Sequence, residues 1–262
     1  MAYPLSATKL LTYRQCPQAY YFKHERRLPA PATFGSAALG NALHQALAEI
    51  YQDWNYAQAL PSLDWFALCW QHHTSSLNEI QIHEGWQALQ RYYQTSIAPQ
   101  PMLRRPLGVE GKIQASFQAS NVEFALTGRY DRLDYLDDGL ELIDYKTSKT
   151  LNPPDAIDIQ LGLYYLVLEQ TYHQALKRLS LIYLRIGQQI TYEVTPEHQQ
   201  QVKALIADLA LKLRADKEWH PQTGKQCDRC GYQRHCPAFH TNPEPLPDTA
   251  QPPPRVQLVL PL

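Results

Sequence analysis

The sequence lacks any long apolar run. Its 262 residues contain no stretch of the roughly 18 uncharged apolar residues that a transmembrane helix requires. The first nine residues also lack the basic and apolar regions of a secretory signal peptide. We therefore expect a cytoplasmic protein that makes no contact with membranes.

Neither sign of charge predominates. The chain carries 24 Lys and Arg against 25 Asp and Glu, a net charge of −1, so any nucleic-acid-binding surface has to be local. The charge is nevertheless uneven, with a net −5 over residues 131–158, +4 over 1–27 and +3 over 203–234. An acidic centre between basic flanks suits a metal site that faces a polyanion, although solvated helix faces would produce the same pattern.

Cysteine is scarce and odd in number. In a reducing cytosol, spaced thiols indicate a metal site more than disulfides. A C-x2-C-x5-C pattern is formed by Cys227, Cys230 and Cys236, and Cys16 lies far upstream of it. Cys69 lies on a helical stripe and is expected to be a core thiol. From this spacing alone, zinc and an iron–sulfur cluster both remain open. The five cysteines are Cys16, Cys69, Cys227, Cys230 and Cys236.

Proline divides the chain into a folded body and a tail. Eight of the 20 prolines fall after residue 236. We therefore expect the body to end near Phe239 and a Pro-rich tail to occupy residues 241–262. Within this tail, the apolar run Val256–Leu260 could add a strand to a sheet edge.

The order of the expected elements predicts an α/β protein. Residues 1–100 have helical patterns, and the alternation of apolar and polar residues over 107–145 predicts strands with a turn at Asp138 and Gly139. The expected helices cover residues 6–15, 41–51, 63–73, 84–97, 155–170 and 196–214, and two later strands cover 178–186 and 189–194. This order predicts a small central mixed sheet flanked by helices.

Two carboxylates and a lysine converge within the predicted sheet. Asp144 and Lys146 are two residues apart and share one face of a strand, and a hairpin turn at 137–139 brings Asp131 close to Asp144. Mg²⁺ relieves the repulsion between adjacent carboxylates, and the lysine can orient or deprotonate water. The set predicts metal-assisted phosphodiester hydrolysis. Taken alone, an Asp-x-Lys pair is more typical of a surface hairpin with ordinary salt bridges.

Two strings of residues carry a family resemblance. Gly128–Asp134 (GRYDRLD) and Ile143–Lys149 (IDYKTSK) resemble the PD-(D/E)XK nuclease superfamily, specifically its RecB-like branch. The resemblance implies a restriction-endonuclease-like core within one domain over residues 1–240. It also implies a helical insertion in the N-terminal part, at about residues 45–100.

The resemblance also implies roles for individual residues. Asp131 and Asp144 would bind Mg²⁺ or Mn²⁺, and the backbone carbonyl of Tyr145 would complete the metal shell. Lys146 would be the catalytic lysine. The segment Gly40–His44 resembles the upstream helix motif of this branch, which implies that His44 is a further metal ligand and can favour Mn²⁺.

A helix motif and several nearby residues extend the site. Gln160 and Tyr164 match the Gln-x-x-x-Tyr motif of RecB-like nucleases, which implies that they contact the DNA backbone and position Lys146. Two acids are interpreted as structural, and two bases as residues that could reach a phosphate. The acids are Glu110 and Asp134, and the bases are Arg129 and Lys149.

The cysteine set also resembles a known arrangement. Cys16 with Cys227, Cys230 and Cys236 is similar to the iron–sulfur staple of AddB-type nucleases and of CRISPR-associated exonucleases. The resemblance implies one [4Fe–4S] cluster that ties the N-terminal helix to the C-terminal segment. Zn²⁺ is the less favoured alternative, because zinc ribbons usually pair two C-x2-C units and the sequence has one.

Together these motifs imply a metal-dependent DNA nuclease. We expect an exonuclease that acts on single-stranded or frayed DNA ends in DNA repair, recombination or CRISPR adaptation, with a repair or CRISPR-adaptation protein as a further partner. A Gly-x-x-x-x-Gly-Lys-Ser/Thr loop is absent, so the sequence gives no sign of ATP hydrolysis. The alternative is a non-catalytic DNA-binding or scaffold subunit of a larger helicase–nuclease or repair complex. The intact Asp131, Asp144 and Lys146 argue against it.

Overall fold

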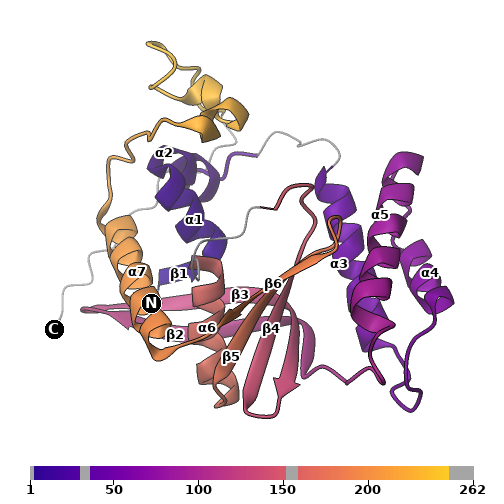
Figure 1. Cartoon of the computed structure of the whole chain (residues 1–262). Helices are drawn as coiled ribbons and strands as arrows, with labels where there is room; N and C mark the ends of the chain where they lie inside the picture. The colour runs from indigo at the N-terminus through magenta and orange to yellow at the C-terminus, as the bar shows by residue number, and fades with distance from the viewer. Residues whose placement is uncertain (1–2, 30–35, 152–158, 248–262) are drawn as a thin grey trace.

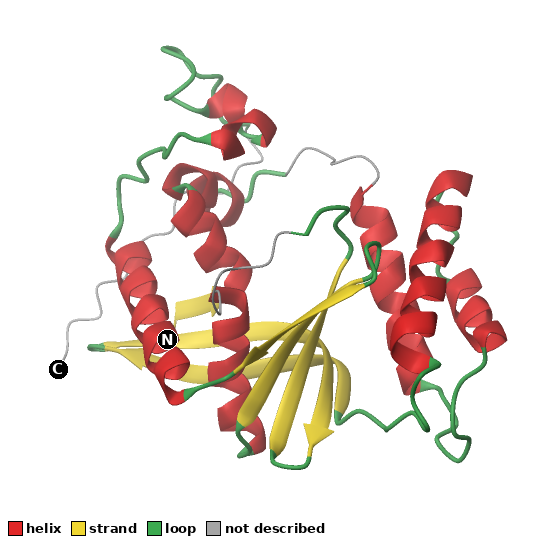
Figure 2. Cartoon of the chain, viewed as in Figure 1, coloured by secondary structure: helices red, strands yellow, loops and turns green. Residues whose placement is uncertain are grey.

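The computed structural model describes residues 3–29, 36–151 and 159–247. Over these residues, a six-stranded mixed sheet carries helices on both faces (Figure 1). The observed architecture confirms the predicted α/β class and its restriction-endonuclease-like mixed sheet, which Figure 2 shows in yellow among the red helices. None of the helices in the described ranges combines the length and apolar character needed to span a membrane.

The strands and helices alternate in groups along the chain. The strands are β1 (Tyr3–Ser6), β2 (Gly108–Ala119), β3 (Val122–Leu136), β4 (Gly139–Lys146), β5 (Leu176–Tyr183) and β6 (Gln188–Glu193). The α-helices are α1 (Ala7–Gln15), α2 (Pro17–Tyr20), α3 (Ser36–Gln52), α4 (Leu63–His72), α5 (Glu79–Tyr92), α6 (Ile159–Tyr172) and α7 (Pro196–Ala215). Short π-helical turns follow α2 (Tyr21–Glu25) and α5 (Tyr93–Ile97), and two 3₁₀ turns (Lys225–Arg229 and Gln233–His235) lie near the cysteines of the C-terminal segment.

The long strand β3 organises the sheet. One of its edges pairs with β2 along almost the whole strand, in antiparallel orientation. The other edge pairs first with the short parallel strand β1 and then with the antiparallel strand β4. Strand β5 continues the sheet parallel to β4, and β6 returns antiparallel to β5. The carboxyl ends of β4 and β5 therefore lie side by side.

Helices α1, α6 and α7 cover one face of the sheet (Figure 1). Helix α6 is apolar around most of its circumference because it packs between the sheet and α7. Helix α7 begins where the sequence predicts: Thr195 accepts a hydrogen bond from the backbone N–H of His198, and Pro196 occupies the first turn. On β4, Leu140 and Leu142 point into this layer.

Helices α3, α4 and α5 form a second apolar layer against the opposite face. Side chains alternate across a strand, so Ile143 and Tyr145 of β4 point into this layer, between residues that face α6. The predicted helix at 84–97 is observed as α5 followed by a π-helical turn that ends at Ile97. In α5, Asn78 and Gln81 form a capping box, which explains the earlier start of the helix.

The second layer encloses the guanidinium group of Arg132. Arg132 on β3 is 8% exposed, and its guanidinium donates hydrogen bonds to the hydroxyls of Tyr92 (2.9 Å) and Tyr145 (2.7 Å). It also lies 3.0 Å from a carboxylate oxygen of Asp134 and over the ring of Tyr51. Asp134 thus forms a structural ion pair, which is the role expected from its sequence context.

Some boundaries differ from the sequence-based expectation. Strand β1 lies in a region where we expected only helices, because four residues are too few for a recognisable alternation. Contacts of the C-terminal segment continue past residue 240, where we placed the start of the tail: the backbone N–H of Glu244 donates to the carbonyl of Arg234, and Leu246 packs near Phe22. The expected start of the helix at 155 and the proposed strand at Val256–Leu260 lie outside the described residues.

Candidate active site

The β3–β4 hairpin sets the relative positions of the acidic residues. Its ladder pairs Arg132 with Ile143, and the same register places Asp131 opposite Asp144. On β4, the Nζ of Lys146 lies 2.7 Å from a carboxylate oxygen of Asp144. The structure thus brings together the three residues that the sequence predicts to converge.

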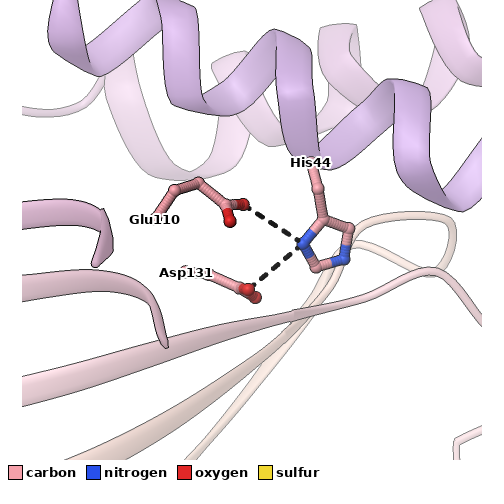
Figure 3. A group of neighbouring side chains, drawn as sticks. All are labelled: His44, Glu110 and Asp131. Atoms are coloured by element: carbon pink, nitrogen blue, oxygen red, sulfur yellow. Dashed lines mark ion pairs between the residues drawn. The ribbon is translucent and has the colours of Figure 1, made fainter. Parts of the chain in front are cut away.

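A histidine and a second acid join Asp131 from other elements (Figure 3). Helix α3 directs His44 toward the sheet, where its Nδ1 lies 3.2 Å from Asp131 and 3.9 Å from Glu110. Glu110 lies on β2 opposite Asp131, in a left-handed backbone conformation with φ of 50°. One potential ligand atom from each of the three residues falls within 4.8 Å of the other two. At this spacing the three residues could share a single cation.

The backbone of Tyr145 fixes the second oxygen of Asp131. The Tyr145 N–H donates to Oδ2 of Asp131 over 2.7 Å, so one carboxylate is held between β4 and the imidazole of His44. The side chain of Tyr145 is turned away, into the layer of α3 and α5. The site therefore meets Tyr145 through its backbone N–H, whereas the family resemblance implies a metal ligand at its backbone carbonyl.

Helix α6 places Gln160 next to Asp144 and Tyr164 next to the backbone of β3. The Gln160 amide nitrogen donates to Asp144 over 2.9 Å, and Lys146 donates to the amide oxygen of Gln160 over 3.5 Å. Tyr164, one turn later, donates through its hydroxyl to the carbonyl of Arg129 at 2.6 Å. Gln160 thus contacts the Asp144–Lys146 pair directly, and Tyr164 ties α6 to β3.

Burial and charge shift the protonation equilibria in this cluster. Burial raises the pKa of the Asp144 carboxyl, and the charge of Asp131 adds to this effect, while Lys146 opposes it. Burial likewise raises the pKa of Glu110, again with a contribution from Asp131. The pKa of His44 is raised: burial opposes the charged form, but the hydrogen bond to Asp131 and the surrounding carboxylates outweigh burial. Three crowded carboxylates thus favour a cation among them.

A comparison with models of protein families identifies the superfamily of this chain. A model of the PD-(D/E)XK nuclease superfamily matches residues 4–237. The chain belongs to this superfamily. Nucleases of the PD-(D/E)XK type use divalent metals, and the oxygen-rich donor set of His44, Glu110 and Asp131 fits such an ion.

Solved structures of low sequence identity share the fold of this PD-(D/E)XK chain. The structure of a protein named SSO0001 has a TM-score of 0.52 and 16% identity, covering 92% of this chain and 88% of that one. A candidate exonuclease from Eubacterium rectale has a TM-score of 0.52 and 10% identity, covering 87% of each chain. A search of curated proteins by sequence found no match. At these identities the likeness concerns the fold alone.

Glu110 has a larger part in the site than the structural ion pair expected from the sequence. It does form the expected ion pair, since Nε of Arg129 lies 2.6 Å from its carboxylate. The same carboxylate, however, also faces His44 and Asp131. Arg129, which we expected to be able to reach a phosphate, is the partner of Glu110 in this ion pair, and its side chain is 60% exposed. The available signal was the position of Glu110 on the strand paired with the Asp131 strand, which becomes informative only with the register.

The four cysteines of the predicted staple line one cavity of this PD-(D/E)XK fold. The cavity has a volume of about 1000 Å³ and lies between the N-terminal helices and the C-terminal segment. The backbone N–H of Gln222 donates to the sulfur of Cys16 over 3.4 Å, which connects the two segments. Cys69 is buried on α4 in the other layer, as expected for a core thiol. The lining cysteines are Cys16, Cys227, Cys230 and Cys236.

Proposed function

We propose that this chain is a RecB-like, divalent-metal-dependent deoxyribonuclease, and specifically an exonuclease that acts on single-stranded or frayed ends. The observation that supports it best is the arrangement around the β3–β4 hairpin: His44, Glu110 and Asp131 gather on one side, and the Asp144–Lys146 pair lies beside them. Repair, recombination or CRISPR adaptation would supply such ends, with a protein of one of these processes as partner.

The proposed chemistry is hydrolysis of a phosphodiester. Water adds to phosphorus, one P–O ester bond breaks, and the leaving oxygen takes up a proton. A bound Mg²⁺ or Mn²⁺ would stabilise the charge that develops on the phosphate oxygens. His44, Glu110 and Asp131 would hold this ion, with Asp144 and the carbonyl of Tyr145 as further ligands.

Lys146 would orient the attacking water and meet a phosphate oxygen. Its ammonium group lies at contact distance from both Asp144 and the amide of Gln160. These two partners restrict the lysine side chain to one side of β4, where the substrate would arrive. In this proposal Gln160 positions Lys146. Tyr164 holds α6 against β3 through its hydrogen bond to the Arg129 carbonyl, which keeps Gln160 beside the lysine.

We also propose that the four cavity-lining cysteines hold one [4Fe–4S] cluster. Thiolates around a tetrahedral zinc, with Zn–S bonds of about 2.3 Å, approach one another to about 4 Å. All four cysteines belong to the described residues, and no three of their sulfurs lie within 4.8 Å of one another. The choice of a cluster over zinc rests on the sequence, which has one C-x2-C unit where zinc ribbons usually pair two. A reducing, cytoplasmic location, which we also propose, would keep these cysteines available as thiolates for the cluster.

The proposed function predicts a clear substrate and metal dependence. With end-labelled oligonucleotides, we expect mononucleotides or short products to appear from an end, only with Mg²⁺ or Mn²⁺, and faster from single strands than from blunt duplexes. Gel analysis of timed samples, with an EDTA control, measures this. Rapid nicking of covalently closed duplex circles with single strands left intact would contradict the preference. Tight DNA binding without cleavage in either metal would instead favour the non-catalytic subunit.

Glu110→Gln should weaken metal binding without unfolding the protein. The amide keeps the size of the side chain but removes one charge from the three-residue group, so we expect the Mn²⁺ dissociation constant to rise about tenfold, equivalent to about 1.4 kcal/mol. Calorimetry measures this, with exposed Glu123→Gln on β3 as the matched control, since among the described residues the Glu123 carboxylate accepts a hydrogen bond from Ser116 on the neighbouring strand. Equal affinities in the two variants would remove Glu110 from the metal site.

A further inference from the structure

A small pocket lined mainly by charged residues lies between α5 and the loops that follow β4 and β5. It has a volume of about 180 Å³. Three of its five lining residues are cations, one is an acid and one is an amide. They are Arg91, Lys149, Arg185, Glu84 and Gln87.

The pocket is next to the proposed catalytic lysine. Lys149 is three residues after Lys146, at the carboxyl end of β4. On the neighbouring strand, Tyr183 pairs with Lys146, and the N–H of Leu184 donates to the Lys146 carbonyl over 3.0 Å. Arg185 is the next residue along this chain. Lys149 and Arg185 thus leave the sheet at the end where Lys146 lies.

The pocket carries an excess of positive charge. Glu84 on α5 accepts hydrogen bonds from Lys149, over 3.0 Å, and from Arg185. Arg91, two turns later on α5, donates to the backbone carbonyl of Arg185. The lining therefore contains one carboxylate and three cationic side chains, which gives the pocket a net charge of +2.

Two of the three cations are held in place. The side chain of Arg185 is only 15% exposed. Arg91 lies across the β5–β6 turn at Gly187, where φ is 75° and a side chain would collide with Arg91. Figure 1 shows this turn beside α3 and α5. Lys149, whose side chain is 67% exposed, forms the outer edge. Guanidinium groups held in place beside one exposed ammonium suit an anion that arrives from solvent.

We propose that Arg91, Lys149 and Arg185 bind a backbone phosphate of the DNA strand, close to the phosphate that is cleaved. This proposal rests on the proposed function, because it assumes that the strand passes Lys146. Glu84 holds the cations in the absence of DNA, and the phosphate then shares them. An arginine and lysine cluster of this kind positions a strand without reading its sequence. The pocket would therefore fix the strand in the site and leave base identity unread.

The test is binding of a short fluorescent oligothymidylate to the full chain in EDTA, so that no cleavage occurs. Lys149→Gln should raise the dissociation constant about fivefold and reduce the slope of log affinity against log salt by about 0.7. Lys212→Gln is the matched control: Lys212 is 64% exposed and lies 2.8 Å from Asp208, much as Lys149 pairs with Glu84. We expect binding by the control to equal that of the unchanged protein.

Glu84→Gln separates phosphate binding from a structural role. It removes the carboxylate that competes with phosphate, so affinity for the oligonucleotide should rise severalfold. If the cluster merely ties α5 to the sheet, Glu84→Gln lowers the melting temperature and leaves affinity unchanged or weaker, which overturns the proposal. Identical binding by Lys149→Gln and Lys212→Gln also overturns it.

The oligonucleotide-binding test in EDTA can be interpreted whether or not the chain cleaves DNA. Selective weakening by Lys149→Gln in a protein without nuclease activity would support the phosphate pocket and contradict the proposed function. Metal-dependent cleavage combined with no effect of Lys149→Gln on binding would support the proposed function and contradict the phosphate pocket. Absence of oligonucleotide binding by the unchanged protein in EDTA would contradict the phosphate pocket, while the cleavage assay with Mg²⁺ or Mn²⁺ would still decide the proposed function.

Discussion

Asp131→Asn should lower the rate of DNA cleavage at least about 100-fold, which corresponds to about 3 kcal/mol of transition-state stabilisation. One oxygen of Asp131 faces His44 and the other accepts the Tyr145 N–H. An asparagine keeps the shape but loses the charge, and its NH₂ cannot replace an accepting oxygen. Single-turnover cleavage of an end-labelled oligonucleotide at saturating Mn²⁺ measures the loss. Asp144→Asn and Lys146→Ala should have effects of similar size.

The matched control for this experiment is Asp208→Asn on α7. Asp208 is an exposed aspartate in an ion pair with Lys212, so its amide variant should cleave at the normal rate. Circular dichroism spectra and melting curves of all variants distinguish a chemical effect from unfolding. Full activity of Asp131→Asn, or cleavage by the unchanged protein in excess EDTA, would rule out the metal-dependent mechanism.

Cys16→Ala should remove the proposed cluster and lower the stability of the protein by several kcal/mol. A cross-link between Cys16 and the cysteines near residue 230 closes a very long loop, and for a disulfide across such a loop the chain-entropy relation gives about 5 kcal/mol. Binding of the cluster adds free energy that is present only in the folded state. Loss of the cross-link should also weaken DNA binding, because it frees the basic N-terminal segment. Anaerobic purification, iron and sulfide analysis, a visible spectrum and thermal melting measure these effects.

Cys69→Ala is the control for the cysteine experiment. Its thiol is fully buried in the layer of α3, α4 and α5, so the variant should lose only packing and keep its iron. Equal iron content in Cys16→Ala and the unchanged protein would exclude Cys16 as a ligand. A colourless protein that holds one zinc and no iron would replace the cluster by a zinc ion and preserve the cross-link.

The sequence predicts those parts of the site that depend on local geometry. Asp144 and Lys146 share a face because side chains alternate along any strand, and Asp131 reaches them through one tight turn. Helix α7 was also predictable, since Thr195 and Pro196 mark its start. These features need no knowledge of distant segments.

Other parts depend on contacts that a linear pattern does not contain. The place of Glu110 beside His44 follows from the register of a long β2–β3 ladder and a left-handed backbone at Glu110. Strand β1 is defined by parallel pairing with a strand more than 100 residues away. Arg132 has the pattern of an exposed strand residue, and only the packing of α3 and α5 encloses it with tyrosines.

Strand β4 places consecutive residues in two different layers. Asp144 and Lys146 face α6, whereas Tyr145 between them reaches the tyrosine hydroxyls and guanidinium on the side of α3 and α5. A minimal fragment made of the sheet and α6 would retain the acid and the lysine. It would lose His44 and the anchoring of Tyr145, on whose N–H the orientation of Asp131 depends. The smallest unit that can keep this geometry is therefore the three-layer assembly, and removing α3 would remove His44 from the proposed metal site.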